Sequence, residues 1–242
     1  MSLLRVDGLE AKHGLLKAVR GIDLALGEGE KLALVGANGA GKTTLLRTIA
    51  GIHPASAGRV HLDGKDITAV PAHRRAAMGI ALVPEGRKLF ASMSVADNLK
   101  VATSARRAGR WSFDTVVEAL PMLKPKLKAT AASLSGGQQQ AVAIGRALMT
   151  NPRVLLLDEL SLGLSPLAVQ GVYDSLAAIA AEGTPLILVE QDLQRTFSVA
   201  DRIVCMLEGL VVASGRTTEM TREEVMDHYF GHRTSGQAQG AA

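Results

Sequence analysis

The chain of 242 residues has a single cysteine and very few aromatic residues. One cysteine, Cys205, cannot form a disulfide within the chain, and a protein without disulfides suits a reducing compartment. Aromatic residues make up 3% of the sequence, whereas 47% of it is hydrophobic. A core built from Leu, Ala, Val and Ile favours a parallel sheet covered by helices over a β-sandwich.

Long apolar runs are also missing. No stretch approaches the roughly eighteen consecutive apolar residues that would predict a membrane-spanning helix. The N-terminal stretch MSLLRVDGLE reaches a charge at once, so we expect no signal peptide. The net charge of +4 is mild and predicts a solvated basic surface rather than a nucleic-acid partner. We therefore expect a soluble protein, or one that docks on another protein.

Strands and helices alternate along the chain. Short apolar runs such as KLALVG, GIALVPE, VLLLDE and PLILVEQ are typical of parallel strands that are buried on both faces. The segment GRVHLDGKDI alternates around Asp63–Gly64 and predicts a hairpin. From about residue 92 to 150 the pattern is helical. The sequence therefore predicts an α/β core with a mostly helical insert, followed by a small, polar tail that we expect to be disordered.

Residues 36–43 read GANGAGKT and match the pattern G-x-x-x-x-G-K-[ST] in full. The loop follows an apolar strand and precedes a helix, which is the context that a phosphate-binding loop requires. Its glycines let backbone N–H groups approach phosphate oxygens, and a helix N-terminus favours negative charge. Lys42 is expected to reach the outer phosphates, and the Thr43 hydroxyl to hold Mg²⁺. The predicted nucleotide-binding residues here are Gly36, Ala37, Asn38, Gly39, Ala40, Gly41, Lys42, Thr43 and Thr44.

Two acidic residues end the strand VLLLDE. In an α/β sheet, ligands bind outside the carboxyl ends of the strands, so adjacent residues there can take different roles. We expect Asp158 to join the Mg²⁺ shell, and Glu159 to orient or deprotonate an attacking water. An acidic pair alone can also be a solvated turn, and the phosphate loop makes the catalytic interpretation the stronger one.

The stretch LSGGQ at residues 134–138 precedes a second helix. Ser135 is a good N-cap residue, and Gly136 and Gly137 leave backbone N–H groups bare. An ordinary capped helix is the alternative interpretation. Because one nucleotide does not need two anion sites, we expect the residues Ser135, Gly136, Gly137 and Gln138 to face the γ-phosphate held by another subunit.

GANGAGKT, LSGGQ and VLLLDE, in this order and spacing, resemble the ATP-binding subunits of ABC transporters. The resemblance covers residues 3–230 and leaves 231–242 as a tail. It implies a phosphate-loop NTPase core of the RecA-like type, an N-terminal antiparallel β subdomain and a helical subdomain inserted at about residues 88–150. It also implies a head-to-tail dimer that closes on two ATP molecules with Mg²⁺. Such a dimer would drive transmembrane permease subunits from the cytoplasmic face of the membrane, as a peripheral protein.

Two further stretches narrow the resemblance. VPEGRKLF at 83–90 and DELSLGLSPL at 158–167 resemble the second ATPase of branched-chain amino acid importers, and ATPases of urea and amide importers share parts of this pattern. The resemblance implies import of branched-chain amino acids, with urea or amides as the alternative cargo. A solute-binding protein outside the membrane would act with the permease and contact this chain only indirectly.

Several positions depart from the family pattern. Glu85 stands where a glutamine usually contacts Mg²⁺ and the membrane partner, and a carboxylate is the stronger metal ligand. His13 stands where an aromatic residue, often Tyr, usually stacks on adenine. Leu160 replaces a usual proline, and Ser165 a usual aspartate.

Gln191 occupies the position of a switch histidine that contacts the γ-phosphate. Its amide can donate to phosphate but cannot carry a proton charge. We therefore expect Glu159 and Gln191 to be the catalytic pair and Glu190 and Asp192 to matter less. The substitution favours a heterodimer with a related ATPase that has the histidine, although a homodimer stays open.

Three other functions compete with a transport ATPase. A DNA-repair or chromosome clamp also has LSGGQ, but it needs a long coiled coil, and no sustained heptads occur here. A soluble ABC ATPase of cofactor assembly would associate with no membrane subunit. A switch that binds ATP without hydrolysing it is disfavoured by Glu159 and favoured by Gln191.

Overall fold

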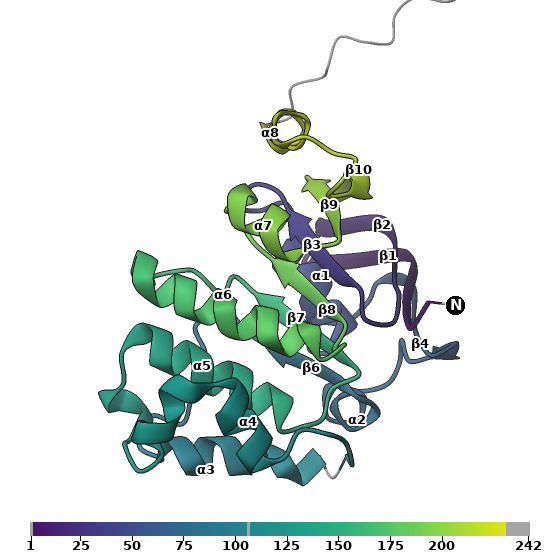
Figure 1. The fold of residues 1–242 in the computed structure, drawn as a ribbon. Coiled ribbons are helices and arrows are strands. Elements are labelled where there is room, and N and C mark those ends of the chain that lie inside the picture. The colour runs from purple at the N-terminus through teal and green to yellow at the C-terminus, as the bar shows by residue number, and fades with distance from the viewer. Residues whose placement is uncertain (1, 106, 231–242) are drawn as a thin grey trace, which may run out of the picture.

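The computed structural model describes residues 2–105 and 107–230; the tail for which disorder is expected lies outside these residues. Two β-sheets and a set of helices make up the described chain (Figure 1). The smaller sheet is antiparallel and is built almost wholly from the N-terminal part of the chain. Its strands, in spatial order, are β2 (Leu16–Leu26), β1 (Leu4–His13), β4 (Ala57–Leu62) and β5 (Lys65–Asp66). The hairpin expected around Asp63–Gly64 is the β4–β5 pair.

The larger sheet has six strands, and every neighbouring pair is parallel except β9 and β10. Strands β7 and β8 are buried along their whole length, as expected for parallel strands covered on both faces. The spatial order is β10 (Leu210–Arg216), β9 (Arg202–Leu207), β3 (Lys31–Val35), β8 (Leu186–Val189), β7 (Val154–Asp158) and β6 (Ile80–Val83).

The parallel register brings the polar segments of the sequence to one edge of the sheet. Leu34 of β3 pairs with Val189 of β8, and Asp158 of β7 pairs with the same Val189. Gly36 follows β3 directly and Gln191 lies two residues beyond Val189, so the phosphate loop, the acidic pair and the glutamine meet there. Ligand sites of open α/β sheets form at this edge.

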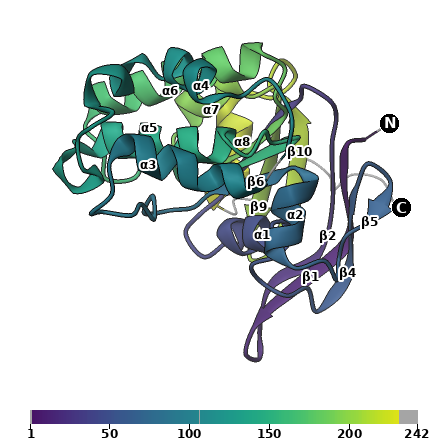
Figure 2. The same cartoon turned by 90° about the horizontal axis from the view of Figure 1, so that it is seen from below.

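Helices cover both faces of the larger sheet. The described segment between β6 and β7 is built mainly from helices, and Figure 2 shows them on one side of the molecule, with α1 between the sheets on the other. The helices of this insert are α3 (Val95–Lys100), η1 (Val101–Ala105), α4 (Phe113–Ala119), η2 (Pro121–Lys126), η3 (Ala131–Ser133) and α5 (Gly136–Leu148). The others are α1 (Lys42–Ile49), α2 (Ala72–Met78), α6 (Pro166–Ala181), α7 (Leu193–Val199) and α8 (Arg222–Phe230).

The two faces of the larger sheet pack into three hydrophobic clusters, and β8 contributes to two of them. Leu186 and Leu188 of β8 pack with α5 and α6, whereas Ile187 and Val189 of the same strand pack with α1 and the smaller sheet. This alternation follows from the two-residue period of a strand. The predicted α/β core with an antiparallel β subdomain and inserted helices is confirmed. The core leaves the carboxyl edge of the sheet free for a ligand.

Candidate functional site

The loop from Gly36 to Gly41 can be made only with glycine at both ends. Gly36 has φ +150° and Gly41 has φ +97°. A Cβ atom at Gly36 would lie 2.1 Å from the Met206 carbonyl oxygen, and one at Gly41 would lie 2.2 Å from that of Ala18. Gly41 is also the N-cap of α1 and offers no side chain to cap it. The first N–H groups of α1 are therefore available to an anion.

Lys42 is folded back over this loop. Its side chain is only 4% exposed, and Nζ donates hydrogen bonds to the carbonyl oxygens of Gly36 at 2.6 Å and Ala37 at 2.9 Å. Burial lowers the pKa of Lys42, while the nearby charges of Glu159 and Asp158 act in the opposite direction. A desolvated ammonium whose hydrogen bonds go to neutral carbonyls is well suited to exchange them for phosphate oxygens.

Asp158 is paired on one oxygen only. The Thr43 hydroxyl donates to Asp158 Oδ1 at 2.9 Å, whereas the buried Oδ2 has no hydrogen-bond partner among the described residues. Burial raises the pKa of Asp158; Thr43 and Arg47 lower it, and the charges of Glu159 and Glu85 raise it again. An unpartnered carboxylate oxygen beside a hydroxyl fits a Mg²⁺ ion, which takes oxygen ligands.

The charge of Glu85 raises the pKa of Asp158, although no described residue forms a hydrogen bond to Asp158 Oδ2. Within the described residues, no group of three or more His, Cys, Asp or Glu side chains could hold a metal. An ion here would therefore depend on phosphate oxygens to complete its shell, as Mg²⁺ in nucleotide sites does.

Glu159 and Gln191 are in direct contact. The Gln191 amide nitrogen Nε2 donates to Glu159 Oε1 and to Asn38 Oδ1, each at 3.0 Å. Glu159 has φ +47°, a left-handed conformation that is uncommon outside glycine and costs on the order of 1 kcal/mol. The structure thus joins the expected catalytic pair to the phosphate loop and holds the carboxylate on a strained turn.

His13 lies at the open side of the same cavity. Its Nε2 is 3.1 Å from the Thr44 hydroxyl, and its exposed ring lies 4.6 Å from the ring of His53, centroid to centroid. His53 had no sequence signal and is brought here by the loop after α1. The cavity is lined by His13, Leu16, Ala18, Asn38, Gly39, Gly41, Lys42, Thr43, Thr44 and Glu159.

The LSGGQ residues are not part of this cavity. Ser135 caps α5 by accepting from the Gln138 N–H, and Gln138 Oε1 accepts from the Ser135 N–H. A Cβ atom at Gly136 would lie 2.9 Å from Leu164, and one at Gly137 would lie 2.9 Å from Ala168. The two glycines therefore also permit close packing of α5 against the loop and helix that follow Glu159.

The sequence analysis underestimated Glu190 and did not single out Arg87. Glu190, expected to matter less, is 1% exposed and accepts hydrogen bonds from Ser161 and from the Gln191 backbone. Its position directly after four apolar strand residues is the sequence feature that could have indicated its burial. Arg87, at φ +62°, donates to Gln139 Oε1 at 3.0 Å and so joins the loop after β6 to α5. Asp192, also expected to matter less, is the N-cap of α7.

A glycine-rich loop before a helix, a buried lysine, and a hydroxyl–carboxylate pair at a sheet edge define a phosphate-loop nucleotide-binding protein. Comparison with known families narrows this class, because the family described as ABC transporter matches residues 19–161. The chain belongs to this family as an ATP-binding subunit, and it is an ATPase. Among its described residues, no helix is long and apolar enough to cross a membrane.

Several relatives align over nearly the whole chain. The high-affinity branched-chain amino acid transport ATP-binding protein BraG of Pseudomonas aeruginosa is 35% identical over 95% of this chain and 100% of its own length. The probable branched-chain amino acid transport ATP-binding protein LivF of Archaeoglobus fulgidus is 33% identical over 92% and 95%. The Fe(3+) ions import ATP-binding protein FbpC of Streptomyces coelicolor is 36% identical over 90% of this chain and 63% of its own.

Solved structures show the same fold. A nucleotide-free ATP-binding cassette from an ABC transporter superposes with a TM-score of 0.80 at 27% identity, covering 94% of each chain. A dimeric bacterial ABC transporter cassette superposes with a TM-score of 0.78 at 22% identity, covering 88% of this chain and 98% of its own.

Proposed function

We propose that this chain hydrolyses ATP to power the uptake of branched-chain amino acids through transmembrane permease subunits. The names of the BraG and LivF relatives, which align over almost their full lengths, support this cargo. Relatives named for ribose, galactose and methyl galactoside, or for Fe(3+), match at similar identity, so cargo follows the permease rather than this chain. Urea or amides are the alternative cargo.

The contact of Gln191 with both Glu159 and Asn38 is the observation that carries the proposed chemistry. It places a carboxylate and a hydrogen-bond donor together at the mouth of the phosphate loop. In the proposed mechanism, Glu159 orients the attacking water and accepts its proton. Gln191 holds Glu159 in place and donates to the γ-phosphate when ATP is bound.

The other residues of the site bind and neutralise the phosphates. Lys42 exchanges its two loop carbonyls for the outer phosphate oxygens, and the N-terminus of α1 supplies further donors. Thr43 and Asp158 would hold Mg²⁺, with Glu85 as a further candidate ligand. When bound, Mg²⁺ neutralises the charge that develops on the phosphate oxygens. His13 would lie against the adenine.

A glutamine can perform this task where a histidine is usual because the site already contains a base. Glu159 can accept the proton, so the residue at position 191 needs only to donate a hydrogen bond. A neutral amide does so at every pH, whereas an imidazole changes its charge near neutrality. We therefore expect that the pH dependence of ATP hydrolysis contains no ionisation of residue 191.

The LSGGQ segment supports a head-to-tail dimer. Ser135 and its two glycines lie outside the cavity of their own chain, so they are free to complete the site of a second subunit. A similar fold solved as a dimeric ABC transporter cassette supports a dimer. Because Gln191 departs from the usual histidine, we favour a second, related ATPase as the partner over a second copy.

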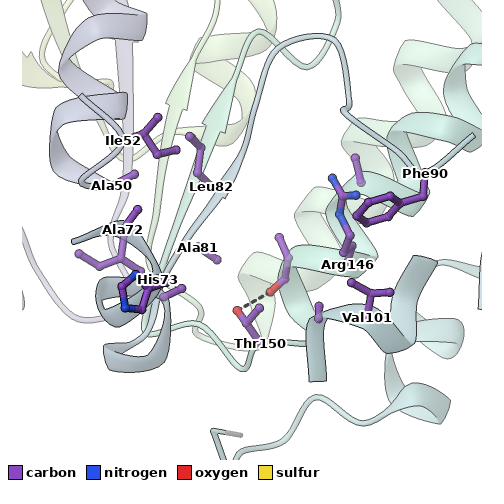
Figure 3. A pocket seen from close by; sticks show the side chains of 15 residues that line it. Ala50, Ile52, Ala72, His73, Ala81, Leu82, Phe90, Val101, Arg146 and Thr150 are labelled. Carbon is purple, nitrogen blue, oxygen red and sulfur yellow. Dashed lines mark hydrogen bonds between the residues drawn. The ribbon is translucent and has the colours of Figure 1, made fainter. Parts of the chain in front are cut away.

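An apolar groove supports the proposed contact with a permease at the cytoplasmic face of the membrane. Figure 3 shows Ile52 and His73 on one wall and Phe90, Val101 and Arg146 on the other. The cavity measures about 430 Å³, and Ile52, Phe90 and Val101 are 58%, 49% and 42% exposed. Arg146 lies 5.8 Å from the Phe90 ring and forms no ion pair with any described residue. A short apolar segment carrying a carboxylate fits this groove.

Steady-state ATP hydrolysis by the purified chain tests the proposal, with Glu159→Gln as the control. We expect the wild type to turn over ATP and the variant to bind ATP but lose at least ~100-fold in kcat, because glutamine cannot accept the proton. Equal turnover by both would show that Glu159 is not the base. ATP binding without turnover by the wild type would indicate a switch, or a need for a partner ATPase that restores activity.

Association separates a transport subunit from a soluble ATPase of cofactor assembly. A transport subunit is recovered with membranes that contain its permease, and Arg146→Glu should weaken this recovery by reversing the charge in the groove. Recovery with no membrane protein in its own host would favour cofactor assembly.

A further inference from the structure

Glu190 is a charged residue at the end of a fully buried strand. Its side chain is 1% exposed, whereas the next residue, Gln191, is exposed. Burial of a carboxylate is costly unless hydrogen bonds or charges compensate it. The hydrogen bonds that offset the cost of burying Glu190 therefore show which segments of the chain its carboxylate connects.

Two of its hydrogen bonds connect different segments through one oxygen. The Ser161 hydroxyl donates to Glu190 Oε2 at 3.0 Å, and the Gln191 backbone N–H donates to the same atom at 3.1 Å. Ser161 lies in the loop between β7 and α6, two residues after Glu159. The carboxylate thus fixes this loop to the residue that contacts Glu159.

The second oxygen of Glu190 faces α6. Neither Glu190 Oε1 nor the Tyr173 hydroxyl has a hydrogen-bond partner among the described residues. Burial, and then the charge of Glu190, raise the pKa of Tyr173. The tyrosine therefore stays neutral beside the carboxylate.

The loop held in this way is exposed beyond Ser161. Leu162 is 53% exposed, and Gly163 adopts φ +69°. At its far end, Leu164 packs within reach of Gly136, at the start of the LSGGQ helix. The loop therefore lies beside the segment proposed to face a second subunit, and its inner end is bonded to the carboxylate behind Gln191.

We propose that Glu190 is a positioning residue that holds Gln191 and the 160–165 loop as one unit. Displacement of the loop by an opposing subunit would then move Gln191 relative to Glu159 and Asn38. The inference rests on the proposed role of Gln191. It adds that the 160–165 loop acts on the position of Gln191 through Glu190. Coupling of this kind has to be shown by a double-mutant cycle, because proximity alone does not prove it.

Steady-state kinetics of Ser161→Ala, Gln191→Ala and the double variant form this cycle. We expect Ser161→Ala to lower kcat about three- to tenfold while KM for ATP stays nearly unchanged. In the Gln191→Ala background, the same change should cost less than about twofold. Ser198→Ala is the matched control, since its hydroxyl also donates a hydrogen bond, but to the Arg195 carbonyl oxygen within α7 rather than to Glu190.

Equal fold losses in both backgrounds would overturn the proposal, because Ser161 would then act independently of Gln191. An unchanged kcat in Gln191→Ala alone would overturn the role of Gln191 and the inference with it. A loss in Gln191→Ala together with no loss in Ser161→Ala would leave the proposed function intact and overturn only the inference.

Hydrogen exchange gives a second measurement that does not depend on activity. Ser161→Ala should speed exchange of the Gln191 amide, about thirty residues away in sequence, because Glu190 loses a partner that fixes its carboxylate. Glu190→Gln should leave exchange of the Gln191 amide as slow as in the wild type and keep kcat within about twofold, since the side-chain amide oxygen still accepts both hydrogen bonds. Unchanged exchange in Ser161→Ala, or loss of activity in Glu190→Gln, would contradict a positioning role.

Discussion

Lys42 and Asp158 illustrate how single residues of the site are kept away from water at a cost to stability. Lys42 is 4% exposed and Asp158 1% exposed. The pKa of the lysine is lowered by burial, and that of the aspartate is raised by it. Each charge is therefore less favourable in the folded protein than in water until a ligand of opposite charge arrives.

Replacement of Asp158 by asparagine should stabilise the nucleotide-free protein. A carboxyl whose folded pKa is raised contributes stability below its unfolded pKa and loses it as pH rises through the folded pKa. At neutral pH the ionised Asp158 therefore destabilises the fold, and Asp158→Asn removes this effect while Thr43 keeps an acceptor. We expect a gain of about 1 kcal/mol, or ~2–4 °C in Tm.

Thermal melts at several pH values check this prediction. The difference in Tm between Asp158→Asn and the wild type should shrink as the pH falls and the aspartate becomes protonated. The variant should also lose ATP hydrolysis and the Mg²⁺-dependent rise in Tm. A variant that is less stable than the wild type at neutral pH would show that Oδ2 is already compensated.

At the scale of elements, Arg75 of α2 links three segments by hydrogen bonds to carbonyl oxygens. The buried guanidinium donates to Thr48 and Ile49 at the end of α1, and to Val70 and Thr68 in the preceding loop, at 2.7–2.8 Å. The last carbonyls of a helix have no partner within the helix. Arg75 thus satisfies the C-terminal end of the helix that starts at the phosphate loop.

Arg75→Met should lower the free energy of unfolding by about 3 kcal/mol, because it leaves buried carbonyl oxygens without donors. The matched control is Arg74→Met, since Arg74 is exposed on the same helix and should change stability by less than about 0.5 kcal/mol. Urea unfolding of both variants measures the difference. Equal effects of the two substitutions would contradict the assigned role of Arg75.

The sequence predicted those elements whose determining residues lie next to one another along the chain. The strand at 31–35 and the phosphate loop were predictable because an apolar run, glycines and a lysine stand in sequence order. Arg75, His53 and Glu190 were not, because each acts on segments that only the folded chain brings near. Within the stretch from about 92 to 150 that is expected to be helical, α3 changes to a 3₁₀ turn at Val101. The Thr103 hydroxyl there donates to the Lys100 carbonyl oxygen, a local bond that competes with the helix.

At the scale of the whole molecule, the proposed nucleotide cavity and the LSGGQ segment are separate in the described part of the chain. In a dimer of this chain with itself, two copies that are inactive for different reasons would therefore restore one another's activity. Lys42→Ala removes the lysine of the cavity, and Ser135→Arg blocks the second segment. In the proposed head-to-tail arrangement, a mixed dimer would retain one complete site, made of the intact loop of one copy and the intact LSGGQ of the other.

We expect each variant alone to lose at least ~100-fold in kcat, and an equimolar mixture to regain measurable turnover. Ser135→Arg also removes an N-cap, which should cost about 1 kcal/mol, so its melting temperature is measured alongside. A mixture no more active than its components, with both variants folded, would show that the chain does not complete its own copies. A related ATPase would then be the partner to test.

The eight-residue helix α1 sets a mechanical limit on how the two ends of the molecule can move. A helix of this size is about 12 Å long and, with a typical curvature radius of ~60–100 Å, is effectively straight. In the proposed site its first turn receives phosphate, and Ala50 and Ile52 just beyond its end line the groove. Because Arg75 holds that end by hydrogen bonds, we expect α1 to move as a rigid rod, so that an axial shift at the phosphate loop would also displace the groove wall.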